Sequence, residues 1–280
     1  MDIIAGLKDK VVVITGGAGV LGAGFTLALA QQGAKVAILG RDEQKAQKLA
    51  QQINNSGGQA IGISVDVCDE SSLKKAHQMI NDAFGLVDIL INTAGGNHPK
   101  GITSDNFFDR KNLSAEEIQT FFKLDAEGLR FIMDLNFMGT LLPIQVFALD
   151  MIGREGCSIL NVSSVAAFHP LTKVPAYSAA KAAISNFTEW LSTYFAKEGI
   201  RVNSIAPGFY LTEQNKSLLT NEDGSLTERG IKILEQTPMG RFGEPEDLNT
   251  TLLWLCNPAS RFVTGMVVAV DGGFLAYTGI

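Results

Sequence analysis

Short apolar runs rich in β-branched residues alternate along the chain with stretches of helical periodicity. Apolar runs of this length are typical of strands buried on both faces of a parallel sheet, because a half-exposed strand would alternate with polar residues. The pattern predicts short strands at Val11–Ile14, Val36–Leu39, Ile61–Val65, Val87–Ile91, Ser158–Val162, Val202–Ile205 and Val267–Val270.

Helical patterns fill the intervals between these strands. They are expected at Leu21–Gln32, Glu43–Asn54, Ser71–Phe84, Ser114–Ile152 with interruptions, Ala176–Lys197 and Glu246–Leu255. This alternation predicts an α/β fold: one doubly wound Rossmann domain over residues 1–280, with a parallel sheet of about seven strands and helices on both faces. Two long irregular segments, 96–113 and 208–243, follow strand ends, so we expect a substrate loop and a lid.

Composition narrows the classes of partner. With 23 basic and 29 acidic residues the formal net charge is −6, which argues against nucleic acid and anionic membranes. The three cysteines, Cys68, Cys157 and Cys256, are widely spaced and form no CxxC pair, so no metal site or disulfide frame is expected. The start of the chain lacks a signal-peptide pattern, and no purely apolar run approaches the ~18 residues of a membrane span. We therefore expect a cytoplasmic protein.

A glycine-rich turn joins the first expected strand to the first helix. Gly17-x-Gly19-x-x-Gly22 fits a dinucleotide fingerprint, in which glycines permit a close backbone approach to a pyrophosphate at a helix N-terminus. The strand–turn–helix–strand context strengthens this hypothesis over a turn that serves packing alone.

A serine, a tyrosine and a lysine follow the fifth strand. Tyr177 and Lys181 are four residues apart, so they share one helix face, where an ammonium is expected to lower the pKa of the phenol. Ser164 lies just past a strand end and can hydrogen-bond the same substrate oxygen, whereas Ser163 should face the other way. A tyrosine of this kind can act as a general acid or base.

In combination these motifs resemble the short-chain dehydrogenase/reductase family over nearly the whole chain. The glycine loop matches as Thr15-Gly16 to Gly22, although the family's middle glycine falls at Val20. Further matches are Asn92-Thr93-Ala94-Gly95, "SVDV", "MDLNFMG", "PG" at 207–208 and "VTGMVVAVDGG".

The resemblance implies a role for each matching residue. Tyr177 would be the acid/base, Ser164 would polarise the carbonyl, Lys181 would hold the nicotinamide ribose, and Asn136 would help hold a proton-relaying water. The implied cofactor contacts are Gly16, Gly17, Gly19, Val20, Leu21, Gly22, Arg41, Asp66, Val67, Asn92, Ala94, Gly95, Tyr177, Lys181, Pro207, Gly208 and Thr212. Asp66 would contact adenine, although it could instead cap the helix that begins near Ser71. The family is commonly tetrameric, which implies a homo-oligomer.

The second expected strand ends in Gly40-Arg41-Asp42, without an acid at its last position. An acid there would accept the ribose 2′-hydroxyl and repel a 2′-phosphate, whereas Arg41 can pair with that phosphate. The sequence therefore favours NADP(H) over NAD(H). Asp42 leaves the alternative open, because it could cap the next helix or accept the 2′-hydroxyl.

Asn136 follows Asn92 by 44 positions, which exceeds the usual distance in the family, and the sequence of this stretch resembles the family's D-mannonate oxidoreductase (fructuronate reductase) branch. That branch implies reduction of D-fructuronate to D-mannonate. Asn97, His98, Lys100, Ser164 and His169 are the expected substrate contacts, with Lys100 or His98 meeting the carboxylate. Alternatively, His98-Pro99 shapes a turn and Lys100 is solvated. The rival functions are a gluconate 5-dehydrogenase-like or other polyol/keto-acid reductase and a non-enzymatic dinucleotide-binding regulator.

Overall fold

The computed structural model describes residues 5–212 and 215–279. Its centre is one parallel sheet of seven strands in the order β3-β2-β1-β4-β5-β6-β7. The strands are β1 (Val11–Thr15), β2 (Lys35–Gly40), β3 (Gln59–Ser64), β4 (Ile89–Asn92), β5 (Cys157–Val162), β6 (Ile200–Pro207) and β7 (Val267–Val270). The order reverses direction between β1 and β4, which creates the crevice where such sheets bind ligands. The predicted fold class is confirmed.

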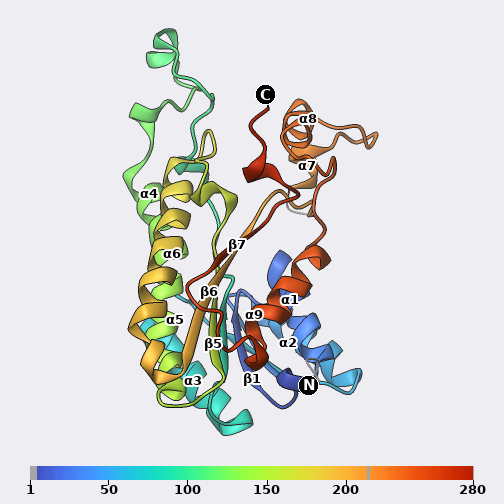
Figure 1. Ribbon diagram of the computed structural model, residues 1–280. Helices are drawn as coiled ribbons and strands as arrows, with labels where there is room; N and C mark the ends of the chain where they lie inside the picture. Colours follow the sequence, from blue (N-terminus) through green and yellow to red (C-terminus); the bar gives the residue numbers. More distant parts are fainter. Residues whose placement is uncertain (1–4, 213–214, 280) are drawn as a thin grey trace.

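Helices cover both faces of the sheet (Figure 1). They are α1 (Val20–Gln31), α2 (Glu43–Asn55), α3 (Glu70–Phe84), α4 (Ala126–Met133), α5 (Gly139–Phe147), α6 (Pro175–Tyr194), α7 (Lys216–Leu219), α8 (Glu228–Glu235) and α9 (Asn249–Cys256). Two apolar cores result, one under α1, α2 and α9 and the other under α3, α5 and α6. Phe25 and Phe147 are the largest fully buried side chains of these two cores.

Two sequence-based expectations about helices were wrong. The helix expected from Ser114 begins only at Ala126, because Asp125 caps it by accepting a hydrogen bond from the Gly128 amide at 2.7 Å. The segment 208–243 is not wholly irregular, since it contains α7 and α8. The amphipathic pattern of α8 is only eight residues long and was hidden among turn-forming residues.

The helical run Ala126–Met151 is long and apolar enough to cross a membrane by length and composition alone, with a mean hydropathy of 1.5. The run is not visible as an apolar segment in the sequence, because charged residues interrupt it. Half of its most apolar window is buried within the fold, and Ile144 and Phe147 belong to one of the two cores. These contacts are those of a core helix.

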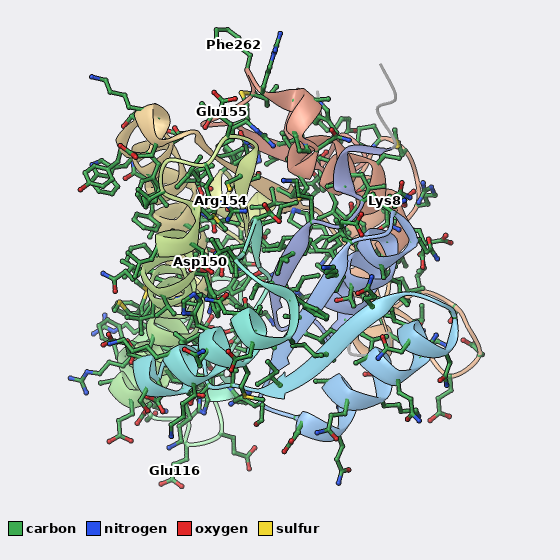
Figure 2. The ribbon with its side chains drawn as sticks, turned by 90° about the horizontal axis from the view of Figure 1, so that it is seen from below. Lys8, Glu116, Asp150, Arg154, Glu155 and Phe262 are labelled. Carbon is green, nitrogen blue, oxygen red and sulfur yellow. The ribbon has the colours of Figure 1, made fainter. Side chains whose placement is uncertain are left out.

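The amino ends of the central strands are tied by a polar cluster, part of which Figure 2 labels. Asp88 pairs with Arg154 at 2.6 Å and Lys10 at 3.1 Å, and Asp150 accepts from the Val87 amide at 3.0 Å. His77, which carried no functional prediction, lies 2.8 Å from Asp150. This cluster stabilises the end of the sheet opposite the carboxyl ends of its strands.

Residues 102–124 form a projection that we call the arm, which extends beyond the ends of α4 and α6 (Figure 1). The arm contains two short 3₁₀ turns, Arg110–Leu113 and Phe121–Lys123, and no α-helix. Several of its large apolar side chains are exposed to solvent. It therefore replaces the first third of the helical stretch that the sequence predicted.

Candidate active site

A cleft of about 400 Å³ opens at the carboxyl ends of the strands. The glycine turn between β1 and α1 forms one wall. Gly16 has φ +63°, a conformation that disfavours any side chain, and a Cβ on Gly22 would lie 2.1 Å from the Gly16 carbonyl oxygen. The turn therefore exposes its backbone, without side chains, at the N-terminus of α1, where N–H groups can bind a pyrophosphate.

The predicted residues of this turn take two kinds of position. Gly16, Gly19, Val20, Leu21 and Gly22 line the cleft. Gly17 does not, because its amide donates to the Leu39 carbonyl at 3.1 Å and a Cβ there would lie 2.9 Å from the Ile14 carbonyl oxygen. Gly17 thus serves the close packing of the turn on the sheet.

Ser164, Tyr177 and Lys181 lie together in the same cleft. Ser164 and Tyr177 line the same cleft, and the Ser164 hydroxyl lies near enough to the phenol to act on its pKa, so both oxygens can face one substrate atom. Lys181 donates from Nζ to the Val162 carbonyl at 2.9 Å, and that nitrogen lies 5.6 Å from the centre of the Tyr177 ring. Helix α6 positions the tyrosine and the lysine one turn apart, as their spacing predicted.

Burial controls the ionisation of these groups. It raises the pKa of Tyr177, while the hydrogen bond with Ser164 acts in the opposite direction. Burial also lowers the pKa of Lys181 to about 8. The direction for Tyr177 differs from the expected lowering, because a buried phenolate loses its hydration, and this loss is the largest cause of the shift. At neutral pH this site therefore holds a protonated phenol, which is a proton donor.

Ser163, the alternative candidate for the active serine, has a structural role. Ser163 is buried, its Oγ lies 2.7 Å from Ser185 Oγ, and it donates to the Lys181 carbonyl at 3.0 Å. These bonds fasten α6 to the end of β5. The geometry therefore favours Ser164 for contact with a substrate.

Asn136 lies in a π-helical turn, Asp134–Met138, between α4 and α5. Its Nδ2 donates to the carbonyls of Ile132 and Gly96, both at 2.8 Å, and its Oδ1 accepts from the Gly96 amide at 3.2 Å. These bonds fix the backbone of the 94–96 segment beside Lys181. A Cβ on Gly95 would lie 2.8 Å from Asn136 Oδ1 and 3.3 Å from Lys181 Nζ, so only a glycine leaves this approach open.

A second cavity, of about 350 Å³, adjoins the first beyond Gly16 and Ala94. Arg41, Asp66 and Val67, which were predicted as cofactor contacts, line it together with Gly40. Asp66 accepts from the Cys68 amide at 2.9 Å. The cap of α3 is Asp69, so the alternative role considered for Asp66 does not apply. Three lining residues that the sequence analysis missed, Phe131, Asp134 and Leu135, come from the helical run that follows the arm.

The opposite wall of the main cleft is built by Pro207, Gly208, Tyr210, Thr212 and Asn215. The sequence indicated the "PG" pair and Thr212 but not Tyr210 or Asn215. Asn215 holds this wall together, since its Oδ1 accepts from the Thr212 amide and its Nδ2 donates to the Tyr210 carbonyl, both at 2.8 Å. No motif in the sequence singles out Asn215, because it belongs to no recognised spacing.

In the part of the chain that the structure describes, Asn92 is not among the residues that line either cavity. It is buried in the sheet and donates from Nδ2 to Asn161 Oδ1 at 2.9 Å. Its neighbour Thr93 does line the cleft and donates to the Thr15 carbonyl. The backbone at Ala94 and Gly95 is therefore what this strand end offers to a ligand, while Asn92 stabilises the strand pair.

The expected substrate residues lie outside the lining of the main cleft, except Ser164. His98 Nδ1 accepts from the Lys100 amide at 3.3 Å, and its ring packs on Phe131 with centroids 5.2 Å apart. Asn97 accepts from the His98 amide, whereas the side chains of Lys100 and His169 are exposed. In this structure His98-Pro99 thus starts a turn, as the alternative interpretation held.

The glycine turn, the second cavity and the Ser164–Tyr177–Lys181 group fit a bound dinucleotide, because the two cavities adjoin each other and share a wall at Gly16, Ala94 and Gly95. Comparison with known proteins gives the same assignment. The family model described as short chain dehydrogenase matches residues 10–223, so the chain belongs to this family. It is an NAD(P)-dependent oxidoreductase that acts on CH–OH groups.

Three known proteins place the chain within the family. An uncharacterized oxidoreductase of Bacillus subtilis is 50% identical over 275 residues, which are 98% of each chain. A Haemophilus influenzae protein, proposed to be a D-mannonate oxidoreductase and solved with NAD bound, is 49% identical, covers 100% of both chains and has a TM-score of 0.94. A gluconate 5-dehydrogenase of Burkholderia cenocepacia, solved with NADP and tartrate, is 26% identical, covers 98% of this chain and 99% of its own, and has a TM-score of 0.82.

Proposed function

We propose that the protein interconverts D-fructuronate and D-mannonate with NAD(P)(H). The placement of Ser164, Tyr177 and Lys181 in one cleft is the observation that carries the reaction class, because it offers two hydroxyls to one carbonyl oxygen. The choice of sugar acid is supported by 49% identity to the Haemophilus influenzae protein, which is described as a proposed D-mannonate oxidoreductase.

The residues of the site would share the work of ketone reduction. A bound nicotinamide supplies the hydride to the carbonyl carbon. As the carbonyl oxygen gains charge, Ser164 donates a hydrogen bond to it and Tyr177 transfers the phenolic proton, which leaves an alcohol and a phenolate. Lys181 Nζ, which lies 5.6 Å from the centre of that ring, would stabilise the phenolate electrostatically. In the reverse direction Tyr177 accepts the proton from the alcohol.

The cofactor preference is part of the same proposal. Asp42 accepts from the Lys45 amide at 3.1 Å and pairs with Lys45 at 3.5 Å, so its carboxylate is turned toward α2. Gly40 leaves the end of β2 without an acid, and Arg41 lines the adenine cavity. These observations favour NADP(H) over NAD(H). NAD binding by the Haemophilus influenzae protein supports the opposite preference, so both cofactors belong in every assay.

Lys100 remains our proposed contact for the substrate carboxylate. It is exposed, and together with other groups its charge lowers the pKa of Asp125, for which the hydrogen bond from the Gly128 amide is the largest cause. A residue that holds a remote carboxylate binds ground and transition states alike, so Lys100→Ala should raise KM with little effect on kcat. Lys111→Ala, another exposed lysine of the same region, is the matched control.

A panel of substrates tests the function. D-Fructuronate, D-mannonate, 5-ketogluconate, gluconate and an uncharged keto-sugar should be compared with both cofactors. We expect the highest kcat/KM for fructuronate and mannonate. A preference for gluconate and 5-ketogluconate would instead support the rival reductase, for which the Burkholderia cenocepacia neighbour is the observation in favour.

A further inference from the structure

The loop 96–101, which leads from β4 to the arm, is held at both ends by one helical run. The Gly96 amide donates to Asn136 Oδ1 at 3.2 Å, and the Gly96 carbonyl accepts from Asn136 Nδ2 at 2.8 Å. At the other end, the Lys100 carbonyl accepts from the Asp125 amide at 3.1 Å. Asp125 caps α4, and Asn136 lies in the π-helical turn that follows this helix. The position of the loop therefore depends on the position of this run.

The loop and α4 also pack without space between them. A Cβ on Gly128 would lie 2.9 Å from Lys100 Cβ and 3.1 Å from His98 Nδ1. A Cβ on Gly101 would collide with Ile132 Cδ1. Closely packed groups transmit a displacement to one another, because there is no void to absorb it. A small shift of α4 therefore displaces the loop.

The same helical run forms part of the wall of the adenine cavity, the space of about 350 Å³ proposed for the adenine of the cofactor. It contributes Phe131, Asp134 and Leu135 to this wall. The side chain of Phe131 is 38% exposed. Aromatic rings exposed in a nucleotide cavity are surfaces on which a purine packs, so binding of the cofactor would cover this ring.

Phe131 also supports the loop. Its ring packs on the imidazole of His98, with centroids 5.2 Å apart and planes inclined by 56°. His98 Nδ1 accepts from the Lys100 amide at 3.3 Å and so caps the turn Pro99–Gly101. One phenyl ring thus belongs both to the wall of the adenine cavity and to the support of the loop. Neither Phe131 nor His98 is among the described residues that line the main cleft.

We propose that Phe131 and His98 are positioning residues that couple occupancy of the adenine cavity to the conformation of the loop 96–101. A purine in the cavity restricts the Phe131 ring to one position. The imidazole that packs on this ring is restricted in turn, and with it the turn that His98 caps. A ligand shifts a conformation only through contacts that differ between the two states, and the contact of the purine with Phe131 is that difference.

The coupling gives the loop a task in catalysis. The loop carries Asn97 and Lys100, so a bound nucleotide would hold these side chains ready for the sugar acid, a consequence that rests on the proposed function. Coupling between two sites is reciprocal, so a sugar acid held by the loop should tighten nucleotide binding by the same factor. Because the loop acts on substrate binding, loss of the coupling should raise KM more than it lowers kcat.

Hydrogen exchange tests the coupling without a sugar acid. ADP-ribose, or its 2′-phosphate if the wild type binds that more tightly, carries the adenine half of the cofactor and lacks the nicotinamide. At saturation it should slow amide exchange in peptides that cover residues 97–102 by at least about fivefold. The slowing should be lost in Phe131→Ala and in His98→Asn, each saturated according to its own dissociation constant.

The variants separate the ring contact from the fold. His98→Asn keeps a side chain that can accept from the Lys100 amide, but it removes the ring that packs on Phe131. Phe262→Ala is the control that should keep the slowing, because Phe262 is fully exposed and is not among the residues that line either cavity. Denaturant unfolding shows whether each variant is folded, and His98→Asn alone decides if Phe131→Ala is not. No slowing in the wild type, or undiminished slowing in His98→Asn, would overturn the proposal.

Titration calorimetry measures the size of the coupling. Phe131→Ala should weaken ADP-ribose binding roughly tenfold, as removal of a stacked aromatic ring does, and Phe262→Ala should leave it unchanged. With saturating D-mannonate the wild type should bind ADP-ribose at least about fivefold more tightly, whereas His98→Asn should show no such gain. An equal gain in both proteins would overturn the proposal. No gain in the wild type, together with slowed exchange in the loop, would contradict the sugar-acid assignment alone.

Discussion

The two sides of the cleft are built in different ways. On the nucleotide side, backbone atoms form the walls, and glycines are required because a Cβ at Gly22 or Gly95 would collide with the chain or with Asn136. On the substrate side, the wall comes from a long segment whose side chains bond to its own backbone, as Asn215 does to the Thr212 amide and the Tyr210 carbonyl. The shape of the nucleotide side is determined by short-range backbone geometry. The shape of the substrate side depends on how the long segments 96–125 and 208–243 fold.

This difference has a functional meaning. The cofactor side has one task, and the same close backbone approach is needed whatever the substrate. The substrate side can change with the length and composition of residues 96–125 and 208–243 without disturbing the sheet. Substitutions at the hydride-transfer centre and the cofactor side should therefore have large, specific effects, and those at the periphery should have smaller effects on KM.

The largest effect is expected at the boundary between the two sides. Tyr177→Phe removes the proton donor and keeps the ring, so kcat should fall by about 10²–10⁴-fold while cofactor affinity stays nearly constant. Steady-state kinetics and fluorescence titration of the cofactor measure the two quantities. If the variant kept more than a tenth of the turnover, the proton would have to come from another group.

The next effect compares neighbouring glycines. Gly95→Ala should displace Asn136 and Lys181 and lower kcat/KM on the order of 100-fold, because small displacements of reacting groups cost this much. Gly96→Ala is the control, since its Cβ would meet only the end of Leu135 at 3.6 Å and should change kcat/KM by no more than about threefold. Similar losses for both variants would mean that the tight approach at Gly95 is not the cause.

A smaller effect is expected at the edge of the adenine cavity. Arg41→Ala should weaken NADP(H) binding roughly tenfold, the lower end for a charge-assisted hydrogen bond, because Arg41 is exposed. NAD(H) binding should hardly change. Titration of both cofactors against both proteins checks this, and equal losses would assign Arg41 to adenine stacking alone.

The smallest effect concerns the buried lysine. Burial lowers the pKa of Lys181 to about 8 from its ordinary 10.5, so between these values the unfolded chain binds more protons than the folded one. The stability of the wild type relative to Lys181→Met should therefore rise by about 1 kcal/mol from pH 7.5 to pH 9. Denaturant unfolding at both values measures the difference. A constant or falling difference would mean that Lys181 keeps its ordinary pKa.

The same contrast explains what the sequence could predict. Strand positions, the glycine turn and the Ser164–Tyr177–Lys181 group follow from patterns of one to four residues or from family motifs. Asn215, Tyr210 and Phe131 could not be found in this way, because they reach the cavities only through the paths of long loops. Helix α4 begins only at Ala126, because Asp125 caps it there. The helical pattern of the residues before Asp125 therefore predicted a start that was too early.

The central claim is hydride transfer to a keto-uronate with a proton supplied by Tyr177. It is tested most directly by single turnover of D-fructuronate with deuterated NADPH and NADH, followed by identification of the product by NMR. The account predicts D-mannonate that carries one deuterium at the former ketone carbon, formed at least about 100-fold more slowly by Tyr177→Phe. Absence of deuterated product with either cofactor, or an unchanged rate in the variant, would contradict it.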